Sequence, residues 1–297
     1  MKKNGYVSRI AFLLLLAAVL TIALVGCSSR QADTTIVVSG STTILPIAEQ
    51  AAEEFRVEHP RDRVLVSGMG SSAGIEAVGV SETADIGTTS RELKDDEENL
   101  GLLKIPIAHD GIAVIVHPSN PIDGLTVEEI RSIFSGQVKN WAELGGADLP
   151  ITLINRDESS GTRDAFGKAI MGDEAFEINA VVLPGTGQVR EVVTRTPGAV
   201  GYISVGFVAP RFSKTEVKAL KVSGIEPTDE NVSSKLYPIA RTLYFLTKGM
   251  PEGVAKEYID YVLSPAVQQG AVIDAGFLPI QADDATDYHP DAPDRKF

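Results

Sequence analysis

The chain has 297 residues, 43% hydrophobic and 23% charged, which is enough for two medium-sized domains and too apolar for a disordered protein. One cysteine excludes an intramolecular disulfide framework, and four scattered histidines exclude a Cys/His zinc cluster, so we expect neither a metal nor a cofactor. Forty acidic against 27 basic residues give a formal charge of −13, which argues against nucleic-acid binding and requires any bound anion to be held by local donors.

The N-terminus has the pattern of an export signal. Lys2, Lys3 and Arg9 precede a sixteen-residue run, residues 10–25, whose only polar member is Thr21. At about 1.5 Å per residue this run would span about 24 Å, less than the ~30 Å hydrocarbon core of a membrane. A cleaved signal peptide is therefore favoured over a permanent transmembrane helix.

The run ends in Leu24-Val25-Gly26-Cys27, which resembles the lipobox of bacterial lipoproteins. The resemblance implies removal of residues 1–26 and lipidation of Cys27, with 27–33 as a tether. Because the signal peptide carries three basic and no acidic residues, the mature chain keeps 24 basic and 40 acidic residues, a formal charge of −16. We expect an exported protein, lipid-anchored outside the cytoplasmic membrane, at the cell surface or in the periplasm.

From Thr34 onward, short β-branched runs alternate with amphipathic stretches, which is typical of an α/β fold. The hydrophobic spacing predicts helices over 44–59, 71–78, 126–134, 162–170, 188–195, 251–263 and 265–275. Strands are expected at 36–38, 64–66, 85–87, 151–154, 181–183, 200–203 and 237–247. Residues 105–116 are expected to form either a strand pair or one crossing strand, interrupted at 109–111.

The order of these elements indicates two lobes. We expect one discontinuous lobe, 34–110 plus 238–281, and one inserted lobe, 111–237. Two chain crossings between the lobes would form a hinge. Residues 282–297 are rich in Asp and Pro and are expected to form a frayed polar tail.

Three expected strands end in Gly/Ser/Thr clusters that open a helix, at 40–43, 70–74 and 159–162. The first turn of a helix presents unpaired N–H groups, and Ser and Thr hydroxyls add donors, so each cluster could bind a small anion. Ordinary helix capping explains any single cluster equally well. Three in one α/β chain favour an anion site, because strand carboxyl ends meet at a common crevice.

Arginine adds a fixed charge with forked donors suited to a tetrahedral oxyanion. Arg156 closes an expected strand just before the third cluster, with Asp157 and Glu158 beside it. Arg91 follows Ser90 at the end of another strand-like segment. An arginine most often forms a surface salt bridge. Arg156 fits that role least, because it closes an apolar strand and adjoins a donor cluster.

Many segments resemble, in order over about 34–281, the phosphate-binding lipoprotein of bacterial phosphate ABC transporters. The matching segments are 40–46 (GSTTILP), 70–74 (GSSAG), 84–91 (ADIGTTSR), 110–116 (DGIAVIV), 133–141 (IFSGQVKNW), 156–163 (RDESSGTR), 197–202 (PGAVGY) and 237–241 (YPIAR).

This resemblance implies an α/β, two-lobed type 2 periplasmic-binding-protein fold, with mixed sheets flanked by helices and a two-crossover hinge. It implies a monomeric binding protein, not an enzyme, that closes over inorganic phosphate and delivers it to the transmembrane subunits of an ABC permease. The expected phosphate-binding residues are Ser41, Thr42, Thr43, Ser71, Ser72, Ser90, Arg91, Arg156, Ser160, Gly161 and Thr162, with Glu158 as the acid that pairs with the site arginine.

The chain departs from the best-known members at two places. Ser90 stands where they have an aspartate, and Ser159 where they have a glycine before Ser-Gly-Thr. The first change bears on selectivity, because monohydrogen phosphate must donate its proton to an acceptor and sulfate has none to donate. Ser90, a backbone carbonyl or Asp85 could be that acceptor, and Arg91 could add attraction.

Other functions stay open at this point. The same donors could bind sulfate, molybdate or tungstate, and a receptor could sense phosphate without transporting it. A phosphoester hydrolase would need a nucleophile with a base or a metal. His109-Asp110 is the only adjacent His/Asp pair, and neighbours on a strand point to opposite faces, which argues against hydrolase chemistry.

Overall fold

The computed structural model describes residues 34–208, 216–281, Asp284 and Tyr288. The elements named below belong to one compact unit that begins at Thr35. The expected signal peptide, Cys27 and the tether lie outside the described residues. Within them, no helix is long and apolar enough to cross a membrane.

Strands and helices alternate along the described chain, as the hydrophobic pattern predicts. The strands are β1 (Thr35–Gly40), β2 (Arg63–Gly68), β3 (Ile86–Thr89), β4 (Leu102–Val116), β5 (Gly124–Leu125), β6 (Thr152–Arg156), β7 (Val181–Leu183), β8 (Ala199–Ser204), β9 (Lys218–Ala219), β10 (Lys221–Val222) and β11 (Ala240–Lys248). The α-helices are α2 (Leu45–Glu58), α3 (Ser71–Gly79), α4 (Asp95–Glu98), α5 (Val127–Phe134), α6 (Gly161–Phe166), α7 (Thr186–Arg195), α8 (Asp229–Ser233), α9 (Gly253–Leu263) and α10 (Pro265–Val267). Shorter helical segments are η1 (Trp141–Leu144), η2 (Gly167–Met171), η3 (Val205–Phe207) and η5 (Gln268–Val272).

The main sheet is mixed and has two parts that share one strand. Its strand order is β2-β1-β3-β11-β4-β8-β6-β7, and β9 also pairs with β4. The long β4 pairs antiparallel with β11 up to Gly111 and with β8 from Ile112 onward. We call β2, β1, β3 and β11 the first half-sheet, and β8, β6 and β7 the second half-sheet.

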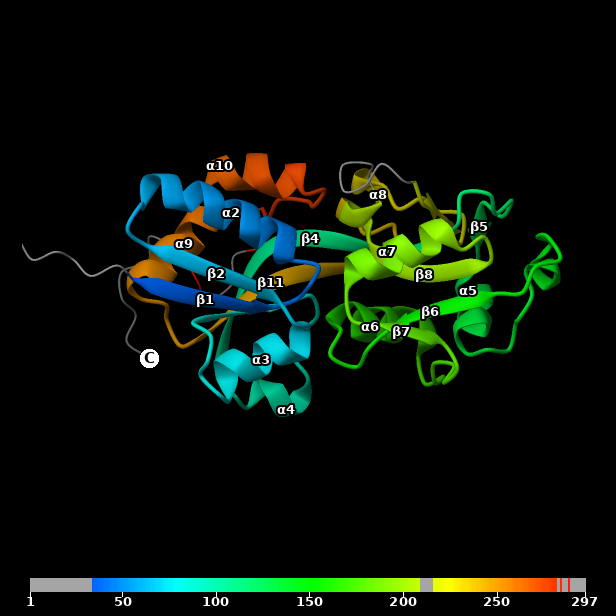
Figure 1. Cartoon of the computed structure of the whole chain (residues 1–297), viewed down its shortest axis with the longest axis horizontal. Helices are drawn as coiled ribbons and strands as arrows, with labels where there is room; N and C mark the ends of the chain where they lie inside the picture. Colours follow the sequence, from blue (N-terminus) through cyan, green and yellow to red (C-terminus); the bar gives the residue numbers. More distant parts are fainter. Residues whose placement is uncertain (1–33, 209–215, 282–283, 285–287, 289–297) are drawn as a thin grey trace, which may run out of the picture. The chain divides into compact units, whose positions relative to one another are not determined.

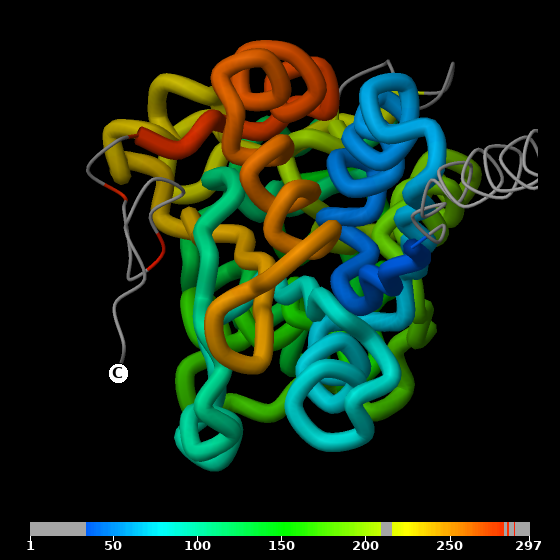
Figure 2. The backbone as a smooth tube through the Cα atoms, turned by 90° about the vertical axis from the view of Figure 1, so that its left-hand side faces the viewer, coloured from blue at the N-terminus to red at the C-terminus, as the bar shows by residue number. Residues whose placement is uncertain are grey.

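Helices flank the first half-sheet on both faces, with α2, α9 and α10 on one face and α3 and α4 on the other (Figure 1). The buried residues of α2 recur at helical spacing, as Ile47, Ala48, Ala51 and Phe55. Figure 2 shows α2 beside α9. There the Tyr258 hydroxyl donates to the Ala48 carbonyl at 2.7 Å.

An aromatic cluster holds α6 against the second half-sheet. Phe166 of α6 stacks on Tyr202 of β8, with ring centroids 4.1 Å apart, and Phe134 of α5 packs edge-on against Phe166 at 4.9 Å. All three side chains are almost fully buried. Because Phe166 fixes α6, the first turn of that helix, which follows β6, has a defined position.

The strand predicted over 105–116 differs from the structure in one respect. The expected interruption at 109–111 is absent, and β4 runs unbroken through it. The physical reason is register: Asp110 lies directly opposite Arg241 of β11, so a buried carboxylate is neutralised within the ladder. The expected lobe boundaries lie near this point, where β4 changes partner, and they stay a prediction.

Two positions of the expected C-terminal tail lie among the described residues, and both make contacts. Tyr288 is buried, and its hydroxyl donates to Asp260. The Asp284 carboxylate lies 2.8 Å from Nε2 of His109. The helix expected over 265–275 divides into α10 and η5, with Ser264 as the predicted N-cap.

Candidate functional site

A small, tightly lined cavity lies where the segments after β1, β2, β3 and β6 meet. Seven of its nine lining residues carry a hydroxyl or a guanidinium: Ser41, Thr42, Ser71, Ser90, Arg156, Ser160 and Thr162, with Gly70 and Gly161 completing the wall. Every one of these lining residues lies in a segment that the donor-cluster argument singled out, except Ser90 and Arg156.

Hydrogen bonds close the cavity by joining the first half-sheet segments to the second. The Thr43 and Thr162 hydroxyls lie 3.1 Å apart, and the Thr42 hydroxyl lies 3.1 Å from that of Thr186 at the start of α7. The N–H of Ser72 donates to the Ser159 carbonyl at 3.1 Å. The three predicted donor clusters therefore converge in the structure.

Gly161 allows the two sides to approach closely. A Cβ at this position would lie 2.3 Å from Oγ of Ser71 and 2.8 Å from Oγ of Ser90, far inside van der Waals contact. Both serines come from the first half-sheet side, and Gly161 begins α6 on the second. A side chain at 161 is thus incompatible with the closed cavity as it stands.

The Arg156 guanidinium is the cation of the cavity. It is 2% exposed, and its Nε and Nη2 donate to the carbonyls of Leu183 (3.1 Å) and Pro184 (2.8 Å). Nη1 and Nη2 also reach the hydroxyls of Thr186 (3.2 Å) and Thr42 (3.3 Å). These bonds fix the orientation of the guanidinium, but every acceptor among them is neutral.

The charge of Arg156 is therefore not cancelled by a contact. Within residues 34–208 and 216–281, no carboxylate hydrogen-bonds or ion-pairs with it. Burial lowers the pKa of Arg156, and Arg241 adds to this effect, while Tyr202 and Asp157 oppose it. An arginine titrates so far above neutral pH that the group stays cationic, so a buried positive charge faces the cavity.

Two serine hydroxyls form a relay on the opposite wall. The N–H of Ser90 donates to Oγ of Ser71 at 3.1 Å, and the two Oγ atoms lie 3.3 Å apart. A hydroxyl can donate and accept at the same time, so whichever serine donates to the other, the pair still holds one proton and lone pairs for a ligand. No described residue that lines the cavity is a carboxylate.

Arg241 and Asp110 support the cavity from the crossing strands, and neither is among the site residues predicted from the sequence. Nε and Nη2 of Arg241 grip Oδ2 of Asp110 at 2.9 and 2.7 Å, and both side chains are buried. Nη1 of Arg241 donates to the Thr162 hydroxyl (2.9 Å) and to the Ser90 carbonyl (3.1 Å). Arg241 thus positions one cavity residue from each side.

The Asp110 carboxylate is satisfied from several directions. Burial raises its pKa, whereas Arg241, the Ser204 hydroxyl and the Gly111 N–H oppose that rise by stabilising the anion. His109, its neighbour in sequence, contacts Thr242 and Asp284 instead. The two residues therefore do not form a His/Asp pair.

Four predicted site residues lie outside the cavity wall. The Thr43 hydroxyl lies 3.1 Å from that of the wall residue Thr162, and the Ser72 hydroxyl accepts from Nη2 of Arg91 at 3.0 Å. Arg91 itself is bound by carboxylates, as described below. Glu158, expected beside Arg156, is 94% exposed and lies 3.9 Å from Arg163.

The turn before α6 explains the position of Glu158. The Asp157 carboxylate accepts the N–H (3.1 Å) and the hydroxyl (2.8 Å) of Ser159. This local turn holds the Asp157 carboxylate against Ser159 and leaves Glu158 in solvent. The acid–arginine pair that the resemblance implied is absent from the described structure.

A possible metal cluster lies elsewhere. His59, Asp62 and Glu257 bring ligand atoms within 4.8 Å of one another where α2 ends beside α9. Nδ1 of His59 is 3.8 Å from Asp62 and 3.5 Å from Glu257, distances that ordinary ion pairs also give. We therefore assign no metal to this surface cluster.

Comparisons with known proteins agree with this geometry. The model of a family described as the PBP superfamily domain matches residues 27–266. The chain is 34% identical to the phosphate-binding protein PstS of Bacillus subtilis over 84% of this chain and 82% of that protein. It is 29% identical to the Borreliella burgdorferi protein of the same name, over 87% and 94% of the two chains.

Solved structures give the same result. A putative phosphate ABC transporter substrate-binding protein from Clostridium perfringens, solved with bound phosphate, is 36% identical with a TM-score of 0.78, covering 83% of this chain and 100% of that one. An ABC-type phosphate transport receptor from Vibrio cholerae is 32% identical with a TM-score of 0.68, covering 82% and 99%. These matches confirm the expected type 2 periplasmic-binding-protein fold. The chain belongs to the PBP superfamily and, within it, to the phosphate-binding proteins of the PstS family.

Proposed function

We propose that this protein binds inorganic phosphate in the closed cavity and delivers it to an ABC permease for import. The observation that carries the proposal is the uncancelled charge of Arg156 in a small cavity lined by hydroxyls. The proteins named above are named for phosphate, which favours phosphate over sulfate, molybdate or tungstate. The family consists of substrate-binding transport proteins rather than enzymes.

The expected ligands act together on a dehydrated oxyanion. Arg156 supplies the positive charge, and the hydroxyls of Ser41, Ser71, Ser160 and Thr162 supply neutral donors around it. The first turns of α3 and α6 also point N–H groups toward their N-terminal ends. The formal charge of −16 on the mature chain repels an anion, but screening over about 8 Å at physiological ionic strength leaves these short-range donors to decide binding.

Discrimination against sulfate rests on the Ser71–Ser90 pair in this proposal. Its lone pairs can accept the proton of monohydrogen phosphate, and a fully ionised sulfate has no proton to offer. Serine hydroxyls rotate, so they repel sulfate less strongly than a buried carboxylate would. We expect phosphate to bind more tightly than sulfate, by a smaller ratio than an aspartate at position 90 would give.

Calorimetric titration tests the substrate directly. The full chain, purified in mild detergent, is titrated with phosphate, sulfate, molybdate and arsenate at pH 6 and pH 8. Binding of phosphate with weaker binding of sulfate supports the proposal. Equal or tighter binding of sulfate or molybdate contradicts the substrate while leaving the fold intact.

We further propose that the mature protein is a monomer held outside the cytoplasmic membrane by a lipid on Cys27. The lipobox-like segment 24–27 supports this anchor. Cys27→Ala should release the protein from membranes while its phosphate affinity stays unchanged, as fractionation and titration would report. Membrane association that persists in Cys27→Ala contradicts the lipid anchor and favours an uncleaved N-terminal helix.

A further inference from the structure

Arg91, expected as a phosphate ligand, is bound by carboxylates outside the cavity. Its side chain is 4% exposed. Nη1 and Nη2 pair with the two oxygens of Glu97 at 2.6 and 2.8 Å, and Nε lies 2.8 Å from Oδ2 of Asp164. The fork of the guanidinium is thus occupied on two sides by acids.

These two acids belong to opposite sides of the molecule. Glu97 lies in α4, a few residues after Arg91 and β3, on the first half-sheet side. Asp164 lies in α6, which packs on β6 and β8 of the second half-sheet. The Arg91–Asp164 contact therefore exists only while the two sides are together.

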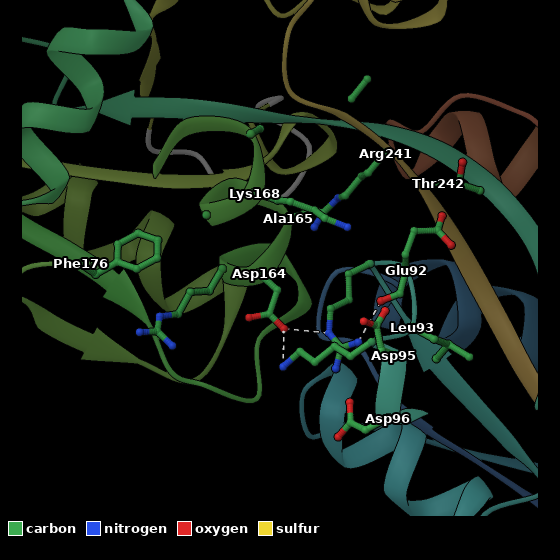
Figure 3. Close-up of a pocket in the computed structure, with 16 residues that line it drawn as sticks. Glu92, Leu93, Asp95, Asp96, Asp164, Ala165, Lys168, Phe176, Arg241 and Thr242 are labelled. Carbon is green, nitrogen blue, oxygen red and sulfur yellow. Dashed lines mark hydrogen bonds and ion pairs between the residues drawn. The ribbon is translucent and has the colours of Figure 1, made fainter. Parts of the chain in front are cut away.

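Lys94 strengthens the same contact. Its Nζ lies 3.2 Å from Oδ2 of Asp164, the atom that Arg91 also binds. Figure 3 shows the Asp164 carboxylate pointing toward the segment that carries Glu92, Leu93 and Asp95, with dashed lines marking its two ion pairs. These groups lie along a groove of about 1050 Å³ that is separate from the phosphate cavity.

The positive and negative charges of this network balance without a ligand. Two cations, Arg91 and Lys94, face two carboxylates, Glu97 and Asp164. Burial opposes ionisation of Glu97, but the hydrogen bonds from Arg91 and from the Lys94 N–H bring its pKa below the ordinary value. No net positive charge is left here for an anion, in contrast to Arg156.

We propose that Arg91, Lys94, Glu97 and Asp164 form an interlobe latch, which stabilises the closed arrangement and slows phosphate release without contacting phosphate. This proposal rests on the phosphate-binding function proposed above. These are positioning residues, because they act through the relative placement of the two sides. Opening the cavity separates Asp164 from both cations, so the latch contributes to the closed state alone.

The latch predicts a change in one rate constant. In Asp164→Asn, which keeps the shape of the side chain, the dissociation rate of phosphate should rise about five- to thirtyfold, as expected for the loss of two ion pairs that are partly exposed to solvent. The association rate should not fall, because encounter occurs in the open state and loss of the latch can only populate that state further. Asp173→Asn removes the same charge from an exposed position of the same side and should leave both rates unchanged.

Two further readouts separate a latch from general disruption. Lys94→Gln changes a half-exposed side chain and should raise the dissociation rate about two- to threefold in the wild-type background but add little in Asp164→Asn, because the partner is already gone. Raising sodium chloride should accelerate dissociation from the wild type more than from Asp164→Asn, since salt screens an ion pair.

Stopped-flow measurement of both rates on the full chain in detergent decides the matter. A dissociation rate for Asp164→Asn equal to that of Asp173→Asn, or a loss of affinity carried by the association rate, overturns the latch. If the wild type binds no phosphate, the proposed function fails, and small-angle scattering of the ligand-free chain tests the latch by itself. A larger radius of gyration for Asp164→Asn than for the wild type then supports the latch, and equal radii overturn it.

Discussion

Two arginines, Arg156 and Arg91, are buried where the two halves of the sheet meet, and their surroundings are opposite. Arg156 donates to carbonyls and hydroxyls, so its charge faces a cavity without a counter-ion. Arg91 contacts two carboxylates and a serine, so its charge is balanced within the protein. Arg156 ends β6 and Arg91 follows β3, each close to a Ser/Thr cluster, so sequence position alone does not separate them.

The difference shows that burial and residue type do not identify an anion ligand. What identifies it is the balance of charge around the guanidinium. An arginine whose partners are all neutral stabilises an incoming anion, whereas one already paired with acids stabilises the contact between those acids. The comparison can be tested by removing each charge in turn.

The largest effect is expected for Arg156→Ala. Phosphate affinity should fall about ten- to hundredfold, because a charge-assisted hydrogen bond worth about 1.5–3 kcal/mol disappears from a desolvated site. Calorimetric titration measures the change. Arg195→Ala, an exposed arginine on α7, is the control and should bind like the wild type. Unchanged phosphate affinity in Arg156→Ala would show that Arg156 does not bind phosphate, and it would contradict the distinction between Arg156 and Arg91.

Arg91→Ala should act on stability instead. The change leaves the Glu97 carboxylate, 15% exposed, without its cation, and it leaves Asp164, 25% exposed, paired with Lys94 alone. We expect the free energy of unfolding without ligand to fall by about 2–3 kcal/mol, less than for a fully buried pair because water reaches both acids. Arg156→Ala strands no acid and should cost about 1 kcal/mol or less. Denaturant titration of both variants compares them, and equal losses would contradict the distinction.

Gly161→Ala sharpens the comparison by separating closure from folding. The new Cβ would collide with Ser71 and Ser90 across the cavity, so phosphate affinity should fall about tenfold. Folding without ligand should be unaffected or slightly improved, because alanine is favoured over glycine in a helix by about 1 kcal/mol. Gly187→Ala in α7, where a Cβ meets open space, is the matched control for titration and unfolding. Full affinity in Gly161→Ala would mean that the cavity tolerates more separation than the structure indicates.

The sequence predicted the elements of the fold and the meeting of the three donor clusters, because both depend on local pattern and on strand ends sharing one edge. It missed Arg241, whose role depends on the register that places it opposite Asp110, and no local signal gives that register. It assigned Arg91 to phosphate because Asp164, about seventy residues away in the chain, completes a pair that only the tertiary structure brings together. The exposure of Glu158 similarly depends on the hydrogen bond from the Ser159 hydroxyl to the Asp157 carboxylate.

The smallest expected effect is a pH dependence confined to the Arg91 side. The pKa of Glu97 is lowered in the folded chain from its ordinary 4.5, so its ion pair contributes stability above pH 4.5 and loses it as the pH falls further. Glu97→Gln should therefore be less stable than the wild type by about 1 kcal/mol at pH 7, as expected for one partly exposed charge-assisted bond. The difference should persist to pH 5 and shrink below pH 4.5, whereas Asp96→Asn, an exposed change in the same helix, should show no such gap. Denaturant unfolding at pH 7, 5, 4 and 3.5 measures it. If the stability difference between the wild type and Glu97→Gln stayed constant or grew in acid, ionised Glu97 would not be what holds Arg91. The distinction between a paired Arg91 and an unpaired Arg156 would then lose its support on the Arg91 side.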